Sequence, residues 1–266
     1  MSRAPRDPKI DPMRLVDSHS HIDAPEFDAD RDAVLARARA AGVVAQVVPA
    51  VAAAGWDALR TLARAHPELK PAYGLHPVHL DAHQPSDLDR LARWLDDERP
   101  VAVGECGLDF FVDGLDPGRQ RACFVAQLEL AREFDLPVVV HARRAVEEVI
   151  ATVRRIGGLR GVVHSYGGSA EQARQLHGLG FRIGIGGPIT FERANRLRSV
   201  VVAAPLSQLL LETDAPDQPD AVHRGQRNEP ARLPHVLAAV AAARGEPEER
   251  IADATSDNAR ELFRLD

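Results

Sequence analysis

Short apolar runs rich in β-branched residues recur along the chain and predict buried β-strands. Each run is bounded by polar residues, glycine or proline. Eight such runs occur, at Leu15–His19, Val43–Val48, Lys70–Leu75, Val101–Glu105, Pro137–His141, Gly161–His164, Phe181–Gly184 and Leu209–Glu212. The regular recurrence of these runs predicts an eight-stranded protein.

Longer segments between the runs place apolar residues at i, i+3, i+4 and i+7, which predicts amphipathic helices. One of them has the apolar face Val146, Val149, Ile150 and Val153. Another begins at Ser169, a predicted N-cap with Gln172 at the capping-box position, and ends at Gly180. In a third, Asp116 and Pro117 stand where an N-cap and the first helical residue belong.

Strands that alternate with helices favour an α/β fold, a TIM-like (β/α)8 barrel, in a single domain over residues 13–266. The alternative is an open doubly wound sheet, but no glycine-rich phosphate fingerprint follows the first strand. Pro234–Arg244 and Ser256–Leu262 predict closing helices after the eighth strand, and residues 1–12 predict a loose tail.

Composition and charge exclude some classes of protein but do not identify a function. The formal net charge of −6 excludes a strongly basic nucleic-acid-binding surface as the global feature. Cys106 and Cys123 are the two cysteines, and they form no CxxC pair, so we expect a reducing compartment. No apolar run is long enough to span a membrane. We therefore expect a cytoplasmic protein with no membrane partner; a monomer is compatible with the sequence, which carries no signal for oligomeric state.

Histidine or carboxylate side chains end five of the predicted strands. His19 and His21 follow the first strand two residues apart, so their side chains point the same way. The other ends carry Glu105, His141, His164 and Asp214. In a parallel barrel all these ends meet at one mouth, and a buried strand has no structural need for such residues at its exit.

These residue types suit two divalent cations. Imidazole nitrogen and carboxylate oxygen favour zinc or manganese, whereas magnesium, a third option, prefers more oxygen ligands. We expect His19, His21 and Asp214 on one ion, His141 and His164 on the second, and Glu105 as a bridge. Two ions about 4 Å apart polarise a phosphoryl oxygen and activate water, with Asp214 as a general base.

The chain resembles the TatD family of metal-dependent deoxyribonucleases, which have amidohydrolase-type barrels, over about residues 14–264. The resemblance is carried by the segments DSHSHID, GLHP, GECGLDFF, QLELAREFDLPVVVHAR, GVVHSYGGS, LLLETDAP and RGQRNEP. It implies a barrel, a one- or two-metal site on the six residues named above, and hydrolysis of phosphodiester bonds in DNA. Ser20, Ser165 and Ala215 stand where the family often has other residues, which suggests a side branch with a different substrate.

A second group of residues is predicted to contact the substrate. His76, at the end of the third strand, is predicted to bind a phosphate or the attacking water, and Glu105, Asp214 and His76 form the predicted catalytic set. Arg143, Arg227 and Asn228 are candidates for phosphate binding, as is Arg224, although ordinary surface roles are the alternative. Asp109 is either a partner that orients a metal ligand or a turn residue.

Three functions remain open from the sequence. The first is a metal-dependent nuclease that removes nucleotides from DNA single strands or ends, as a 3′-5′ exonuclease. The second is a metal-dependent esterase or amidohydrolase, for example on aminoacyl esters, because an activated water attacks either centre. The third is a non-catalytic binding protein, against which the presence of all six candidate ligands argues.

Overall fold

The computed structural model describes residues 13–265. Eight parallel strands form one sheet in the sequential order β1 to β8. The strands are β1 (Leu15–Asp17), β2 (Val43–Pro49), β3 (Leu69–Tyr73), β4 (Ala102–Asp109), β5 (Val138–Arg143), β6 (Gly161–Val163), β7 (Phe181–Ile185) and β8 (Leu209–Leu211). Parallel neighbours in this order require a helical crossover after each strand, which is the (β/α)8 arrangement.

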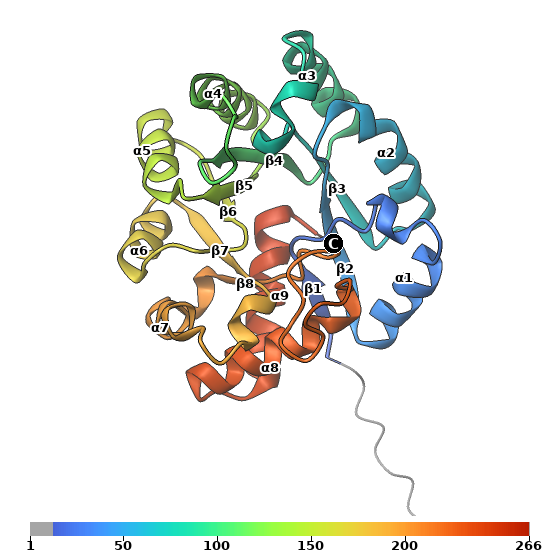
Figure 1. Cartoon of the computed structure of the whole chain (residues 1–266), viewed down its shortest axis with the longest axis vertical. Coiled ribbons are helices and arrows are strands. Elements are labelled where there is room, and N and C mark those ends of the chain that lie inside the picture. Colours follow the sequence, from blue (N-terminus) through green and yellow to red (C-terminus); the bar gives the residue numbers. More distant parts are fainter. Residues whose placement is uncertain (1–12, 266) are drawn as a thin grey trace, which may run out of the picture.

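The helices alternate with the strands along the chain, and Figure 1 shows all but the last of them arranged around the sheet in chain order. They are α1 (Arg31–Ala40), α2 (Trp56–Ala65), α3 (Ser86–Glu98), α4 (Pro117–Glu133), α5 (Val146–Ile156), α6 (Ala170–Gly178), α7 (Asn195–Ala203), α8 (Leu233–Arg244) and α9 (Glu248–Phe263). The predicted capping box of α6 is confirmed, because Ser169 and Gln172 bond each other's backbone. Asp116 caps α4 by accepting the amides of Gly118 and Arg119.

The seam between the last and first strands is joined by hydrogen bonds just beyond β1 and β8. The amide of Ser18 donates to the carbonyl of Leu211 at 2.9 Å, and the amide of Asp214 donates to the carbonyl of His19 at 2.9 Å. The open doubly wound sheet is therefore the wrong alternative, and the single-domain barrel is confirmed. This seam also places the ends of β1 and β8 side by side.

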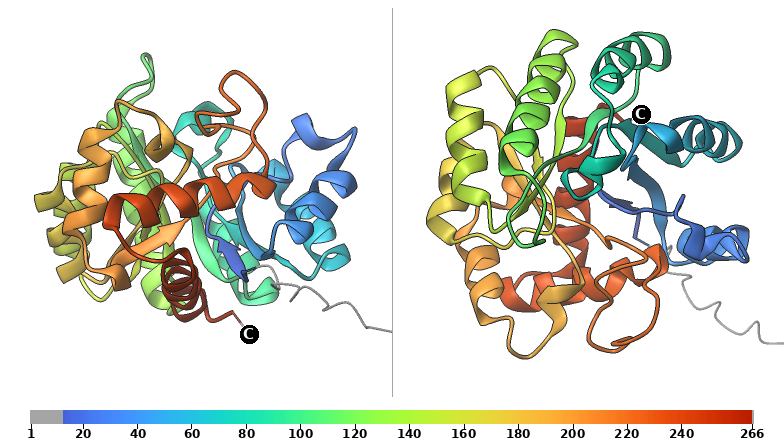
Figure 2. Two further views of the ribbon diagram at one scale, coloured as in Figure 1. Left: turned by 90° about the horizontal axis from the view of Figure 1, so that it is seen from below. Right: turned by 45° about the horizontal axis from the view of Figure 1, so that its top comes forward.

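Helix α9 covers the end of the barrel where the strands begin. Asn258 on this helix donates to the carbonyls of Leu206 and Leu209, and Ser256 donates to the carbonyl of Arg14. Apolar side chains of α9 pack against the barrel interior, and this cluster contains Val16, Ala45, Val47, Ala72, Ala102, Val139, Val162, Leu210, Ala259, Leu262 and Phe263. In Figure 2 (left) the loop after β8 rises at the end opposite α9. The open mouth is therefore the end where the strands finish.

Two predicted boundaries differ most from the structure. The fourth strand extends beyond Glu105 to Asp109, with a register shift against β5 between Val103 and Cys106, where Gly104 has a positive φ of 151°. The last helix begins at Glu248 rather than Ser256, because Ile251 and Ala252 are already buried on its inner face. The tail predicted over residues 1–12 lies outside the described residues. Within residues 13–265, no helix has the length and apolarity needed to span a membrane.

Candidate metal centre

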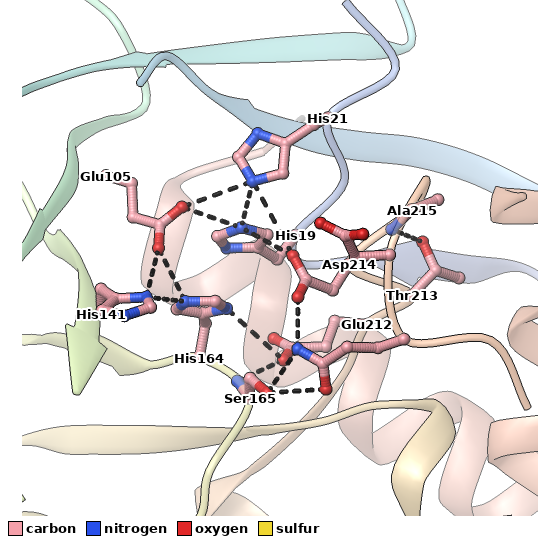
Figure 3. A network of polar contacts seen from close by, with 12 residues as sticks. His19, His21, Glu105, His141, His164, Ser165, Glu212, Thr213, Asp214 and Ala215 are labelled. Carbon is pink, nitrogen blue, oxygen red and sulfur yellow. Dashed lines mark hydrogen bonds and ion pairs between the residues drawn. The ribbon is translucent and has the colours of Figure 1, made fainter. Parts of the chain in front are cut away.

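Six side chains from five strand ends converge at the mouth of the barrel (Figure 3). His19 and His21 follow β1, and Glu105 and His141 lie on β4 and β5. His164 follows β6, and Asp214 comes shortly after β8. The structure thus brings together all six residues that the sequence singled out as metal ligands.

One group of ligand atoms surrounds the nitrogens of the two histidines after β1. His19 Nε2 lies 3.1 Å from His21 Nε2, 3.2 Å from Glu105 Oε2 and 3.4 Å from Asp214 Oδ1. His21 Nε2 lies 3.4 Å from Glu105 Oε2 and 3.8 Å from Asp214 Oδ1. Four ligands about 2.0–2.1 Å from a tetrahedral ion lie roughly 3.3 Å apart, so this spacing fits one cation.

A second group surrounds the other oxygen of the same glutamate. Glu105 Oε1 lies 3.1 Å from His141 Nδ1 and 2.7 Å from His164 Nε2, and these two nitrogens are 3.2 Å apart. Figure 3 shows one carboxylate oxygen of Glu105 turned toward each group. A single carboxylate therefore joins two sets of ligand atoms, which is the arrangement of a bridging ligand.

One oxygen of Glu105 lacks the hydrogen bond that a buried carboxylate needs, which also favours a bound cation. Glu105 Oε2 is fully buried and makes no hydrogen bond among the described residues, although it lies between two imidazoles. A buried carboxylate oxygen without a hydrogen bond carries a large desolvation cost unless another positive partner faces it. The set of four imidazoles and two carboxylates supplies such a partner when it holds divalent ions.

Electrostatics at the mouth favour positive charge. Burial would raise the pKa of Glu105, but His164, His76 and His19 around it lower that pKa well below its usual range. Burial would also lower the pKa of His164, yet the Glu105 carboxylate raises it to about 10. The pKa of His21 is raised to about 9, again by Glu105 against the effect of burial. The buried carboxylates therefore favour positive charge at this place, which is the charge that a bound cation would supply.

Asp109 orients one of the predicted ligands. Its Oδ2 lies 2.9 Å from His141 Nε2, while its Oδ1 accepts the amides of Phe111 and Val112 at 2.8 and 3.0 Å. Because Asp109 accepts the Nε2 proton, the Nδ1 lone pair of His141 is left to face Glu105. Burial would raise the pKa of Asp109, but these donors lower it to about 2.

His76 turns a protonated nitrogen toward Glu105, whereas His141 turns its lone pair toward the same carboxylate. Its Nδ1 accepts the amide of Val78 at 3.1 Å, so in the neutral ring the proton sits on Nε2. That Nε2 lies 3.1 Å from Glu105 Oε1, and burial lowers the pKa of His76 to about 4. The carbonyl of His76 is in turn held by His83 Nε2 at 2.8 Å. His76 is therefore a neutral, positioned hydrogen-bond donor at the edge of the cluster.

Buried acidic residues that the sequence reasoning missed support the cluster from below. Asp17 accepts the amide and hydroxyl of Thr213 at 3.0 and 2.6 Å and thereby ties β1 to the segment after β8. Glu212 accepts the amide of Ser165, and burial raises its pKa to about 8. In the sequence, these residues appear only as acidic positions within the segments DSHSHID and LLLETDAP. The sequence does not show which acidic side chains of these segments face the mouth.

Asp214 is fixed in an uncommon backbone conformation. It has a φ of 56°, and Ser165, which follows His164, has a φ of 45°. The side-chain amide of Gln218 donates to Asp214 Oδ2 and also contacts the Ser165 hydroxyl. Left-handed conformations of non-glycine residues persist where surrounding contacts determine them, and they cluster at functional sites.

The predicted substrate-binding residues are placed differently from one another. Arg143 is the exposed last residue of β5, with its guanidinium 3.6 Å from the centre of the Phe111 ring. Arg227 instead forms a two-pronged ion pair with Asp30, with distances of 2.8 Å. Asn228 is buried, and its amide donates to the carbonyls of Thr213, Asp217 and Gln218. Arg224 is exposed on the same loop.

Comparisons with known proteins agree with this geometry. The sequence profile of the family described as TatD related DNase matches residues 16–264. The chain is 41% identical to the uncharacterized metal-dependent hydrolase YjjV of Escherichia coli K12, over 95% of this chain and 98% of that protein. It is 37% identical to a Rahnella protein named 3′-5′ ssDNA/RNA exonuclease TatD, over 92% of this chain and 96% of that protein.

A solved structure shows the same barrel. The crystal structure of E. coli YjjV, a TatD homologue, superposes with a TM-score of 0.90 at 39% identity and covers 96% of this chain and 99% of that one. The sequence match, the fold and the six converging side chains agree with one another. The chain therefore belongs to the TatD related DNase family and is a metal-dependent hydrolase.

Proposed function

We propose that this protein hydrolyses phosphodiester bonds at the ends of single-stranded DNA, as a 3′-5′ exonuclease that uses two divalent cations. The observation that carries the proposal is the Glu105 carboxylate, with one oxygen in each of two groups of metal-ligating atoms. Two-ion sites are typical of enzymes that cleave phosphodiester bonds by in-line displacement. The name of the Rahnella relative supports the same class of substrate.

The ligands divide between the ions as their contacts group them. His19, His21 and Asp214 would hold the first ion, His141 and His164 the second, and Glu105 would contribute one oxygen to each. Four imidazoles favour zinc or manganese over magnesium. When bound, the ions supply Lewis-acid polarisation of a phosphoryl oxygen and make water more acidic.

The chain's own residues supply proton transfer and substrate orientation. Asp214 is the proposed general base, because burial raises its pKa and Gln218 fixes its second oxygen. His76 is the proposed donor to a non-bridging oxygen of the substrate phosphate, because its Nε2–H already points into the cluster. Because burial lowers the pKa of His76 to about 4, its imidazole is neutral near pH 7 and adds no positive charge next to the cations.

The predicted substrate-binding residues would act in two ways on the nucleotides that lie outside the metal centre. Arg143 is exposed beside the Phe111 ring, an arrangement that suits a phosphate and an adjacent base. Arg227 and Asn228 are proposed to act through the loop after β8, whose backbone they fasten, since their polar atoms already have partners. Such contacts position Gln218, and through it Asp214.

The test is hydrolysis of a single-stranded oligonucleotide labelled at its 3′ or 5′ end. Metal-stripped protein should be inactive, and manganese or zinc should restore activity, with the 3′ label released first. His19→Ala and His141→Ala should abolish the activity, whereas the control His177→Ala, exposed on α6, should retain it. Turnover of chromogenic carboxylic esters without any DNA hydrolysis would instead support a metal-dependent esterase.

A further inference from the structure

A cavity of about 440 Å³ opens beside the metal centre, between the segments that follow β6 and β7. Ser165, the neighbour of His164, forms its inner edge, and Phe191, Arg193 and Arg196 line its outer part near the start of α7. Ligand cavities have volumes of about 300–1,000 Å³, so this one is large enough for a nucleotide-sized group. We call it the α7 groove, defined by Ser165, Tyr166, Phe191, Arg193 and Arg196.

The charge of the α7 groove is positive, in contrast with the acidic chain as a whole. Arg193 and Arg196 are exposed, and neither forms an ion pair within residues 13–265. No aspartate or glutamate among the described residues lines the cavity. Arginines elsewhere on the surface are commonly paired, as in Arg121 with Glu148 and Arg60 with Glu98. Two uncompensated guanidinium groups therefore gather at one edge of the mouth, where they suit phosphate oxygens.

The segment that carries the aromatic wall is fixed in place. Arg198 donates to the carbonyls of Ile189, Phe191 and Glu192 at distances of 3.1, 2.6 and 3.0 Å. On the opposite wall, Tyr166 is buried, and its hydroxyl donates to the carbonyl of Ser169 at 2.7 Å. These contacts form the groove before any ligand binds.

Glycines border the groove. At Gly184 a Cβ atom would lie 2.0 Å from the Glu212 carboxylate, so no larger residue fits beneath the cluster. At Gly167 a Cβ atom would meet nothing within 4 Å, which shows that the backbone borders open space. The groove thus runs from the metal centre to the two free arginines past an apolar wall.

We propose that the α7 groove binds the part of a single-stranded nucleic acid that adjoins the bond being cleaved. Arg193 and Arg196 bind successive backbone phosphates, and the walls formed by Phe191 and Tyr166 receive a base. A phosphate track beside an aromatic side chain is the usual design for single-strand binding. This proposal rests on the proposed function and names the surface that holds its substrate.

The test measures binding of fluorescein-labelled hexathymidylate with a phosphorothioate backbone to the metal-loaded protein. We compare Arg193→Ala/Arg196→Ala with the control Arg93→Ala/Arg155→Ala, which removes the same charge from exposed positions on α3 and α5. The groove variant should bind about tenfold more weakly, and its salt dependence should flatten by roughly 0.7 per lost phosphate contact. Phe191→Leu should weaken binding of hexathymidylate more than binding of an abasic strand.

The outcomes separate this proposal from the proposed function. Equal affinity and equal salt dependence in the groove variant and the control overturn the α7 groove, even if the wild type hydrolyses bis(p-nitrophenyl) phosphate. Conversely, arginine-dependent binding in a protein that hydrolyses no phosphodiester supports the groove and overturns the proposed catalytic activity.

Discussion

Asp109→Asn tests whether a hydrogen bond outside the cluster sets the metal affinity. Asparagine preserves the size of the side chain, and its Oδ1 can still accept the amides of Phe111 and Val112. Its NH2 group then replaces the oxygen that lies 2.9 Å from His141 Nε2. Two donors would face each other there, so the imidazole proton must move to Nδ1. The nitrogen that faces Glu105 and His164 would lose its lone pair for a cation.

The size of the effect follows from the role of this contact. Loss of a partner that orients a ligand typically lowers metal affinity by about 10–100-fold, or roughly 1.4–2.7 kcal/mol. Only one of the two groups of ligands contains His141, so the weaker binding should affect one ion. Titration calorimetry of manganese or zinc into the metal-stripped protein should show one unchanged site and one weakened site.

A matched control separates this effect from a general loss of structure. Asp116→Asn makes the same chemical change at the N-cap of α4, where asparagine caps as well as aspartate. It should leave both metal affinities unchanged, and both variants should unfold cooperatively. Metal affinities of Asp109→Asn within twofold of the wild type would refute the tautomer argument.

Four further substitutions test the scaffold. Trp56→Ala removes a fully buried ring that packs against Tyr73, and we expect it to lower the free energy of unfolding in urea by about 3–5 kcal/mol. Gly107→Ala would place a Cβ atom 2.0 Å from the carbonyl of His141 at a φ of 146°, so it should both destabilise the fold and weaken metal binding. Gly55→Ala, with open space around the new methyl group, should leave metal binding and activity as in the wild type. Asn258→Ala leaves two carbonyls at the closed end of the barrel without their donor and should cost about 1–3 kcal/mol in the same urea assay, with metal stoichiometry unchanged.

Strand order and the six converging side chains follow from local features of the sequence. An apolar run that ends in a histidine or carboxylate, such as the one before His141, specifies both a buried strand and a polar group at its exit. In a parallel barrel those exits must meet, so spacing along the chain becomes proximity in space. The strand positions were therefore predictable before any contact was known.

Contacts across the barrel were not predictable in the same way. Asp17 and Thr213 are 196 positions apart, and nothing local shows that they bond. Arg227 has the residue type of a phosphate ligand, yet Asp30 and the ring of Phe27 are its partners. Most basic residues of this chain are arginines, so Arg193 and Arg196 could be recognised only from their place on one cavity beside Ser165.

The central claim is that Glu105 joins two cation sites, and a crystal structure of the manganese-loaded protein tests it most directly. Anomalous scattering at the manganese edge should show two peaks about 4 Å apart, one on each side of the Glu105 carboxylate. His19 and His21 should contact one peak, and His141 and His164 the other. Fully loaded protein with no peak against Glu105, or with ions only elsewhere on the surface, would contradict the account.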